Sequence, residues 1–328
     1  MKNQVLITGG CGFLGRHFSK YLSDRGWEIF VVDDLSTGIK PDAWPDHLKV
    51  PNLHFVQADL RDYLKDDTQT YDLAIHLAAV VGGRAVMEGK PAMNAHSLEL
   101  DALFFRWASQ YKPKQIVYMS SPAIYPIDLQ DDEEKGIALK EDLVDFKTLG
   151  SRFGMPDLVY GWSKLSGEFL ASTFAKHYGL NVFCPRPFSG YGEDQDLSYP
   201  VPAICDRAVK KENPLVLWGS GKQTRDFIYV DDIVEAIISY LPKLRRYETM
   251  NLGRGVSNTF RDVAKLAAQC MGYDPTIKNL EGKPEGVKSR FADITRMKEH
   301  YQAKVSLQEG IKKVVEFLNG KQKNGNLD

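Results

Sequence analysis

The sequence lacks the residue patterns of several protein classes. Its four cysteines, Cys11, Cys184, Cys205 and Cys270, are scattered along 328 residues without the spacing of metal ligands, so we expect no metal site. A chain of this length can bury a core without disulfides, and such cysteine usage is typical of a reducing compartment. No basic block interrupts a sequence whose net charge is −1, which argues against nucleic acid as a partner.

Long hydrophobic runs are also missing. No apolar stretch is long enough to cross a bilayer, so we expect no membrane partner. No leader-like segment precedes the first apolar run, "QVLIT" at residues 4–8, which favours a cytoplasmic location. The composition, 43% hydrophobic and 26% charged, is typical of a soluble globular protein.

Short β-branched runs alternate with helical patterns in the first half of the chain. Buried strands are predicted at residues 4–8, 28–33, 53–59, 73–79, 115–121 and 181–188, with helices near 13–25, 92–110 and 157–179. Strands that alternate with helices indicate parallel βαβ units. The expected fold is therefore α/β, a doubly wound parallel sheet.

The pattern changes after about residue 186. Residues 225–232 are predicted to form a strand that rejoins the first domain, followed by a helix to about Tyr240. Weaker alternation in 186–224 and 254–318 predicts a smaller C-terminal lobe. The charged segment 128–157 is expected to be a loop over the site, and the polar end of the chain is expected to fray.

A glycine-rich turn follows the first predicted strand and opens a helix. Gly9, Gly12 and Gly15 in "GGCGFLG" permit a tight turn, the close approach of a pyrophosphate and close helix–strand packing. The helix N-terminus supplies N–H groups and a positive dipole end for the phosphate. Asp33, at the end of the second strand, is placed to accept from a ribose 2′-hydroxyl, which favours NAD over NADP; its other interpretation is a strand-end cap. Asp59 is a candidate adenine contact or, alternatively, another strand-end acid.

Tyr160 and Lys164 in "YGWSK" lie four residues apart in a predicted helix, so they share one face. A free phenol ionises at about pH 10, and a nearby ammonium group favours the phenolate. The pair is a candidate acid/base unit, and its alternative interpretation is a solvated helical pair. It follows both the glycine turn and a strand that ends in two serines, Ser120 and Ser121.

With these elements in order, the chain resembles the extended short-chain dehydrogenase/reductase family, in particular its nucleotide-sugar enzymes. The shared motifs are "GGCGFLG" (9–15), "DDLSTG" (33–38), "HLAA" (76–79), the serine strand, "YGWSK" (160–164) and "RDFIYVDD" (225–232). The resemblance implies a triad of Ser121, Tyr160 and Lys164. In that triad Tyr160 moves a sugar hydroxyl proton, Ser121 hydrogen-bonds that oxygen, and Lys164 holds the cofactor ribose.

The resemblance also implies the domain boundaries and further site residues. The expected domains are a Rossmann-type NAD-binding domain of residues 1–185 and 226–253, a nucleotide-sugar lobe of 186–225 and 254–320, and a frayed tail, 321–328. The expected NAD contacts are Gly9, Gly12, Phe13, Leu14, Gly15, Asp33, Asp34, Ser36, Thr37, Gly38, Asp59, Leu60, Leu77, Ala78, Ala79, Ser97, Tyr160, Lys164, Pro187 and Phe188. The expected substrate contacts are Gly82, Gly83, Arg84, Ser120, Ser121, Ser189, Arg225, Lys288 and Arg290.

Within the family, the chain is most similar to the branch of GDP-mannose 3,5-epimerase and GDP-fucose synthase. The similar stretches are "SSPAIYP" (120–126), "VVGGR" (80–84), "WGSGKQTRDF" (218–227) and "KPEGVKSRFAD" (283–293). This similarity favours a GDP-linked sugar, whose diphosphate Arg225, Lys288 and Arg290 would bind through charge-assisted bonds. It also implies a homodimer through the helices near 95–110 and 157–177.

The chain departs from that branch at Ala123, where the branch has a cysteine that acts as an acid/base beside the sugar ketone. The matching downstream loop, "SGYGEDQDLSYP" (189–200), has neither lysine nor histidine, although it has Glu193 and Asp194. Alanine cannot move a proton, so we expect hydride transfer alone, at sugar carbon 4, by a 4-dehydrogenase or a 4-epimerase. The alternatives are a 3,5-epimerase-like enzyme and a non-catalytic NAD-binding regulator, which would show no NADH absorbance change with nucleotide sugars.

Overall fold

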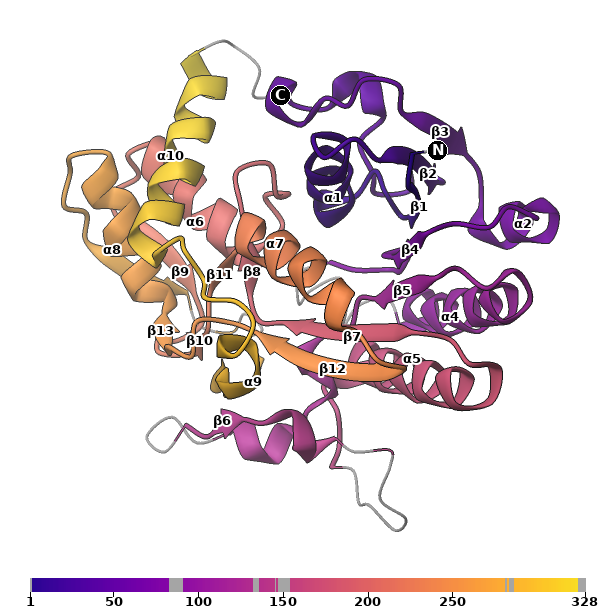
Figure 1. Cartoon of the computed structure of the whole chain (residues 1–328). Coiled ribbons are helices and arrows are strands. Elements are labelled where there is room, and N and C mark those ends of the chain that lie inside the picture. Colours follow the sequence, from indigo (N-terminus) through magenta and orange to yellow (C-terminus); the bar gives the residue numbers. More distant parts are fainter. Residues whose placement is uncertain are drawn as a thin grey trace.

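A parallel sheet forms the centre of the protein in the computed structural model (Figure 1). The structure describes residues 2–82, 91–131, 136–144, 146, 154–280, 282 and 286–323. Within these residues the sheet has seven strands in the spatial order β3–β2–β1–β4–β5–β7–β12, and all neighbouring strands are parallel. The strands are β1 (Gln4–Thr8), β2 (Glu28–Asp33), β3 (His54–Gln57), β4 (Leu73–His76), β5 (Gln115–Tyr118), β7 (Val182–Pro187) and β12 (Tyr247–Leu252). This order confirms the doubly wound α/β fold.

Helices cover both faces of this sheet (Figure 1). The helices are α1 (Phe13–Ser23) and α7 (Val230–Tyr240) on one face, and α2 (Leu60–Asp66), α4 (Pro91–Tyr111) and α5 (Leu158–Tyr178) on the other. Successive side chains of a strand point to opposite faces. Val5 and Ile7 of β1 therefore enter the core beneath α1 and α7, while Leu6 enters the core beneath α4 and α5.

The strand order reverses between β1 and β4, which places a crevice at the carboxyl ends of these two strands. Thr8 ends β1 and His76 ends β4, and the two residues are paired in register. Tyr118 ends the neighbouring strand β5, just before the two serines. The candidate residues at strand ends therefore gather along one edge of the sheet.

A second group of elements has its own hydrophobic core. It is built from α6 (Pro200–Val209), β9 (Leu215–Trp218), α8 (Phe260–Cys270), β14 (Ile277–Leu280) and α10 (Leu307–Lys323). The remaining strands and the short helix α9 are β6 (Ala138–Leu139), β8 (Gly190–Tyr191), β10 (Thr224–Arg225), β11 (Ile228–Tyr229), β13 (Asn258–Thr259), β15 (Ser289–Ala292) and α9 (Thr295–Lys298). Among the described residues, no helix is long and apolar enough to cross a membrane.

Several single 3₁₀ turns connect these elements. They are η1 (Pro41–Ala43), η2 (Asp46–Leu48), η3 (Pro122–Ile124), η4 (Ile127–Gln130), η5 (Glu141–Leu143) and η6 (Leu241–Lys243). Two of them, η4 and η5, lie in the segment expected to be a loop over the site, and β6 pairs with β15 there.

The structure differs from the sequence expectations at several places. Residues 225–232 do not form one strand that rejoins the central sheet, because β10 and β11 each pair in a small separate sheet and helix α7 already begins at Val230. The seventh strand of the sheet is β12, which the sequence pattern does not predict. Its sequence "YETMNL" lacks the apolar run of a central strand because β12 forms the edge of the sheet. Helix α10 continues to Lys323, into the predicted polar tail.

Candidate active site

The glycine turn of residues 9–15 forms a cradle that only glycine fits. Gly9 has φ of +67°, and a Cβ there would lie 2.7 Å from the backbone nitrogen of Ala78. A Cβ on Gly15 would lie 2.5 Å from the backbone of Gly10, so glycine allows α1 to pack close to the turn. Gly12 is the N-cap of α1 and makes no side-chain cap hydrogen bond. The first turn of α1 therefore presents N–H groups suited to a pyrophosphate.

Asp33 is buried beside this turn, with 9% of its surface exposed. Its Oδ2 accepts from the Cys11 N–H at 2.9 Å and its Oδ1 accepts from the Leu35 N–H at 2.8 Å. Burial raises the pKa of Asp33 above the usual aspartate value, although both N–H groups oppose this effect. The carboxylate therefore caps the strand end, and each oxygen keeps a lone pair for a ribose hydroxyl. Asp33 can therefore cap the strand end and still accept from a ribose 2′-hydroxyl.

Asp59 has a strong local role. It is the N-cap of α2, where its Oδ1 accepts from the Arg61 N–H at 2.8 Å, and it forms an ion pair with the Arg61 guanidinium at 2.6 Å. This contact holds the pKa of Asp59 below its usual value. The strand-end interpretation accounts for these contacts, and adenine binding by Asp59 stays a prediction.

The other predicted NAD contacts lie around the same crevice. Leu77, Ala78 and Ala79 follow β4, and Ser97 of α4 accepts the Val80 N–H at 3.0 Å. Phe188 is fully buried against Tyr125, so only its main chain could meet a ligand. The remaining members, Phe13, Leu14, Asp34, Ser36, Thr37, Gly38, Leu60 and Pro187, lie at the start of α1, after β2, at the start of α2 and at the end of β7.

The two serines that follow β5 have different environments. The Ser121 side chain caps η3, accepting the Ala123 N–H at 3.2 Å, and its own hydroxyl proton stays available for donation. Ser120 Oγ is buried and has no partner among the described residues. Ala123 packs against the start of helix α5, because its carbonyl accepts the Asp157 N–H at 2.8 Å.

Tyr160 and Lys164 lie on α5 next to this serine segment. Lys164 is buried, and its Nζ donates to the carbonyl of Met119 at 2.9 Å. The same ammonium lies 6.0 Å from the centre of the Tyr160 ring. A Cβ on Gly161 would overlap the carbonyl of Ala123, so glycine lets the helix approach closely. The structure therefore brings the segments of Ser121, Tyr160 and Lys164 together.

The predicted substrate contacts include basic residues near β10 and β15 and small residues that follow β4 and β7. Arg225 and Arg290 are neighbours in register on β10 and β15, and Arg290 already forms an ion pair with Asp157 at 2.8 Å. Lys288 is exposed. Ser189 follows β7, while Gly82 follows β4 in the described chain; Gly83 and Arg84 lie outside the described residues. Arg290 thus contacts the N-cap of the helix that carries Tyr160, a connection that the sequence does not reveal.

The acidic side chains of the loop 189–200 have hydrogen-bond or ion-pair partners. Asp194 forms a 2.6 Å ion pair with Arg16, and its Oδ1 lies 2.7 Å from His17 Nε2. Burial alone would raise the pKa of Asp194, but His17 and Arg16 outweigh it and lower that pKa to about 2. Burial would lower the pKa of His17, yet its contacts with Asp194 and Asp231 raise that pKa to about 9. At neutral pH this group is a buried ion-paired cluster on α1.

Two further residues of this loop, Glu193 and Tyr199, also have neighbours of their own. Glu193 hydrogen-bonds Tyr229, and burial together with this acid raises the pKa of Tyr229. Burial raises the pKa of Tyr199 above the usual tyrosine value. Tyr199 therefore keeps its proton near pH 7.

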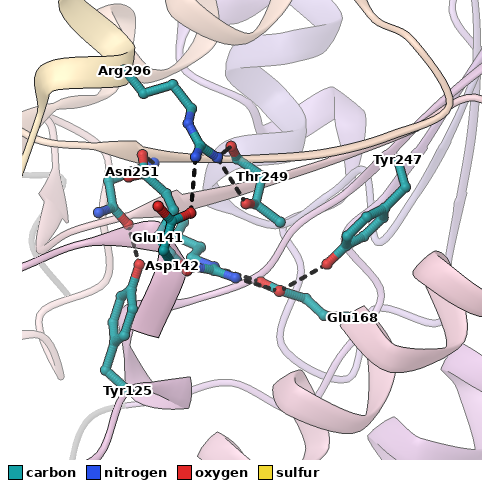
Figure 2. A network of polar contacts seen from close by, with 9 residues as sticks. Tyr125, Glu141, Asp142, Glu168, Tyr247, Thr249, Asn251 and Arg296 are labelled. Atoms are coloured by element: carbon teal, nitrogen blue, oxygen red, sulfur yellow. Dashed lines mark hydrogen bonds and ion pairs between the residues drawn. The ribbon is translucent and has the colours of Figure 1, made fainter. Parts of the chain in front are cut away.

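A second buried network, absent from the sequence predictions, contacts helix α5, which carries Tyr160 and Lys164 (Figure 2). Arg186 of β7 makes a two-pronged ion pair with Glu168 of α5, with N–O distances of 2.9 and 2.7 Å. Arg186 also donates to the Tyr125 hydroxyl at 2.8 Å, and Tyr125 donates to Asn251 Oδ1 at 2.6 Å. The one sequence signal for this network is the spacing of Glu168 four residues after Lys164, on the same helical face.

Comparison with known proteins identifies the family. The sequence pattern of the NAD dependent epimerase/dehydratase family matches residues 5–253, so the chain belongs to this family. It is 28% identical, over 96% of this chain and 98% of the relative, to a putative UDP-glucose 4-epimerase of Methanocaldococcus jannaschii. It is 26% identical, over 91% of this chain and 76% of the relative, to GDP-mannose 3,5-epimerase 1 of Oryza sativa subsp. indica.

A solved structure agrees with this assignment. Thermus thermophilus UDP-glucose 4-epimerase in complex with NAD matches with a TM-score of 0.80 and 26% identity, covering 97% of this chain and 99% of that chain. NAD is the cofactor of the family, and the glycine cradle, the uncapped helix α1 and the buried Asp33 fit it. The chain is an NAD-dependent enzyme of nucleotide-sugar metabolism.

Proposed function

We propose that this enzyme is a nucleotide-sugar 4-epimerase, which oxidises sugar carbon 4 and returns the hydride to the opposite face. The observation that supports the proposal is that Lys164 of α5 contacts both the segment of Ser121, through the carbonyl of Met119, and the Tyr160 ring, whose centre is 6.0 Å away, while the inert Ala123 packs against the start of the same helix. A 4-dehydrogenase, which would release the keto-sugar, uses the same residues. The names of the similar proteins favour the epimerase.

Each triad residue has a role that its position supports. Tyr160 takes the proton of the carbon 4 hydroxyl as its phenolate, and Ser121, whose Oγ already accepts the Ala123 N–H, donates its proton to the same oxygen. NAD supplies the acceptor for the hydride that leaves carbon 4. Lys164, whose ammonium lies 6.0 Å from the centre of the Tyr160 ring, would hold the cofactor ribose. Reversal of these transfers on the other face of the sugar gives the 4-epimer.

Among the residues that the structure describes, the candidate bases for proton exchange at carbons 3 and 5 are missing or engaged elsewhere. Ala123 offers only a methyl group, and Asp194 is bound to Arg16 and His17. Glu193 is engaged by Tyr229. A base must lie within hydrogen-bond reach of the proton it removes, so these contacts argue against a 3,5-epimerase.

The proposed nucleotide is GDP, on the similarity of residues 120–126, 218–227 and 283–293 to the GDP-sugar branch. Arg225 and Arg290, adjacent on β10 and β15, are the proposed diphosphate ligands, together with the exposed Lys288 just before β15. Several similar proteins carry UDP-sugar names, so UDP-sugars are the main competing substrates.

The proposed assembly is a homodimer through α4 and α5. These two helices pack against each other and carry exposed apolar side chains, Met93 and Leu98 on α4 and Trp162 and Phe169 on α5. Exposed apolar groups on neighbouring helices are typical of an interface. Sedimentation equilibrium would test this, and a monomer at micromolar concentration would contradict it.

The deciding experiment is a panel of GDP-, UDP-, CDP- and dTDP-sugars incubated with the enzyme in deuterium oxide and analysed by NMR. We expect a 4-epimer without enzyme-dependent deuterium at carbon 3 or carbon 5. Deuterium at those carbons would restore the 3,5-epimerase. Accumulation of a keto-sugar with NADH would indicate the dehydrogenase, and no product together with no NADH absorbance would indicate a regulator.

The Tyr160→Phe variant is the companion test, because it removes the proton acceptor and keeps the ring. Turnover should fall by about 10²-fold or more while NAD still binds. Near-normal turnover would mean that another residue moves the proton.

A further inference from the structure

Four buried polar side chains connect the floor of the cofactor crevice to the surroundings of Lys164. Thr8 Oγ1 lies 2.7 Å from His76 Nδ1, and His76 Nε2 lies 3.1 Å from Asp101 Oδ1. The Tyr118 hydroxyl donates to Asp101 Oδ2 at 2.7 Å. All four residues are at most 1% exposed, and they come from β1, β4, α4 and β5.

The partners determine where the protons of this network lie. An aspartate can only accept, so His76 Nε2 carries a proton and Nδ1 accepts from the Thr8 hydroxyl. Burial lowers the pKa of His76, which keeps the imidazole neutral. Thr8 Oγ1 in turn accepts from the Ala78 N–H at 3.4 Å, next to the Gly9 cradle. Every donor therefore has one acceptor, and the chain of bonds ends at the Asp101 carboxylate.

Tyr118 connects this network to Lys164. The Lys164 ammonium lies 5.1 Å from the centre of the Tyr118 ring, within the range of a cation–π contact, and its hydrogen-bond acceptor is the neutral carbonyl of Met119. A hydroxyl that donates to a carboxylate makes its ring richer in electrons. The Asp101 charge thus strengthens the face on which the ammonium rests.

The catalytic helix is shaped to admit this pair. A Cβ on Gly167 of α5 would overlap the Tyr118 hydroxyl and would lie 2.7 Å from Asp101 Oδ2. Gly167 is less than one helical turn from Lys164. The absence of a side chain at 167 lets α5 approach Tyr118 and Asp101 closely enough for Lys164 to reach the ring.

We propose that Asp101 is a positioning residue, which acts through Tyr118 to hold Lys164 and through His76 and Thr8 to hold the cofactor floor. The inference rests on the proposed function insofar as Lys164 serves hydride transfer. Asp101 is only 1% exposed, so we expect it to act through the groups that it contacts. Its effect is to fix one orientation of these groups.

Several titratable groups face this network from the elements packed against it. Besides His76 and Tyr118, which belong to the network, they are Cys184 and Arg186 from β7, and Lys164 and Glu168 from α5. Asp101 is the negative charge in direct contact with both His76 and Tyr118. Removing a buried negative charge favours the deprotonated form of each neighbouring group.

The test compares Asp101→Asn and Tyr118→Phe with the matched control Tyr71→Phe. Tyr71 is fully buried in the same hydrophobic cluster, and its hydroxyl contacts only Tyr63 and Asp67 in the described chain, away from Lys164. NAD affinity is measured by calorimetry, and kcat, KM and the pH–rate profile are measured with the substrate found in the sugar panel.

For Asp101→Asn we expect NAD affinity to weaken by about 3- to 10-fold and kcat to fall by about 10-fold, with KM for the sugar changed less than about 3-fold. Because loss of the Asp101 charge favours deprotonation of the neighbouring groups, the acidic and the basic limb of the pH–rate profile should both shift to lower pH. Tyr118→Phe should change NAD affinity and kcat in the same direction, less strongly, and Tyr71→Phe should match the wild type. The double variant should lose less than the sum of the two single changes, because both act through one contact.

Wild-type NAD affinity and an unshifted pH–rate profile in Asp101→Asn and Tyr118→Phe would overturn the inference, as would losses no larger than those of Tyr71→Phe. If Asp101→Asn does not fold, Tyr118→Phe still decides, because it keeps the ring and removes only the hydroxyl. If the wild type turns over no nucleotide sugar, the proposed function fails, while the calorimetry still tests the positioning role.

Discussion

Two buried polar networks contact helix α5 at adjacent residues, and they are built differently. At Gly167 the helix meets the Asp101–Tyr118 pair, in which a carboxylate is satisfied by two neutral donors. At Glu168 it meets Arg186, in a fully buried two-pronged ion pair (Figure 2). The first network faces Lys164 and the cofactor crevice, while the second reaches Tyr125 and Tyr247.

This difference separates two roles within one helix: the Arg186 pair bears on stability, and the Asp101 pair bears on the geometry around Lys164. A buried ion pair is strongly destabilising to break, because one charge is left without a partner. A carboxylate held by neutral donors next to an ammonium mainly sets geometry and local potential. We therefore expect changes in the Arg186 network to appear first in unfolding, and changes in the Asp101 network to appear first in turnover.

The largest expected effect is that of Arg186→Met. It leaves the Glu168 carboxylate buried with only Tyr247 as donor among the described residues, so stability should fall by about 3–5 kcal/mol in urea unfolding. The double variant Arg186→Met/Glu168→Leu should recover more than half of that loss. A single variant within about 1 kcal/mol of the wild type would show that the pair is not the structural element we describe.

Gly167→Ala should affect both stability and turnover, because it separates α5 from Tyr118. The added methyl group overlaps a buried hydroxyl, and overpacking of this kind costs about 1–3 kcal/mol. The matched control is Gly320→Ala in α10, where nothing lies within 4 Å of the new Cβ. This control should be neutral or stabilising by about 0.5–1 kcal/mol. Equal melting temperatures for the two variants would contradict the close approach at Gly167.

The His17–Asp194 contact extends the comparison to a pair whose charge depends on pH. The pKa of His17 is raised to about 9, so its contribution is present below the unfolded value near 6.5 and is lost as pH rises through about 9. The pKa of Asp194 is lowered to about 2, so its contribution is present above the unfolded value near 4 and is lost as pH falls through about 2. We expect His17→Gln to cost about 1–2 kcal/mol at pH 5 and much less at pH 9.5. A cost that is independent of pH would contradict the ion pair.

The smallest expected effect is that of Tyr247→Phe. Its hydroxyl donates to Glu168 Oε2 at 3.3 Å, and that oxygen already has Arg186 as a partner. Loss of this bond should cost about 0.5–1 kcal/mol, and kcat should be unchanged. A clear fall in kcat with unchanged stability would remove the distinction between the two networks.

Local patterns predicted the parts of the site that depend on neighbouring residues. The glycine turn, Asp33 at a strand end, and the four-residue spacing of Tyr160 and Lys164 are each visible within a few positions, and the fold they indicated is confirmed. The boundaries were less accurate, since the strand predicted at 115–121 ends at Tyr118, where Ser121 starts a 3₁₀ turn.

The remaining contacts join distant parts of the sequence. Arg16 meets Asp194 across 178 positions and Arg290 meets Asp157 across 133, and no local period marks such partners. Asp101 is one acid in an otherwise ordinary helical pattern. Its importance depends on Tyr118 and Gly167, which reach it only when β5 and α5 pack against α4.

The ion pair between Arg290 and Asp157 has a consequence for the order in which the protein is made. Asp157 precedes helix α5, but its partner is 133 residues further along the chain. At a synthesis rate of about 5–20 residues per second, that partner is added roughly 7–27 seconds later. The ion pair at the start of α5 therefore forms only after 133 further residues have been added. The nascent chain can therefore form its parallel sheet before Arg290 is available to pair with Asp157.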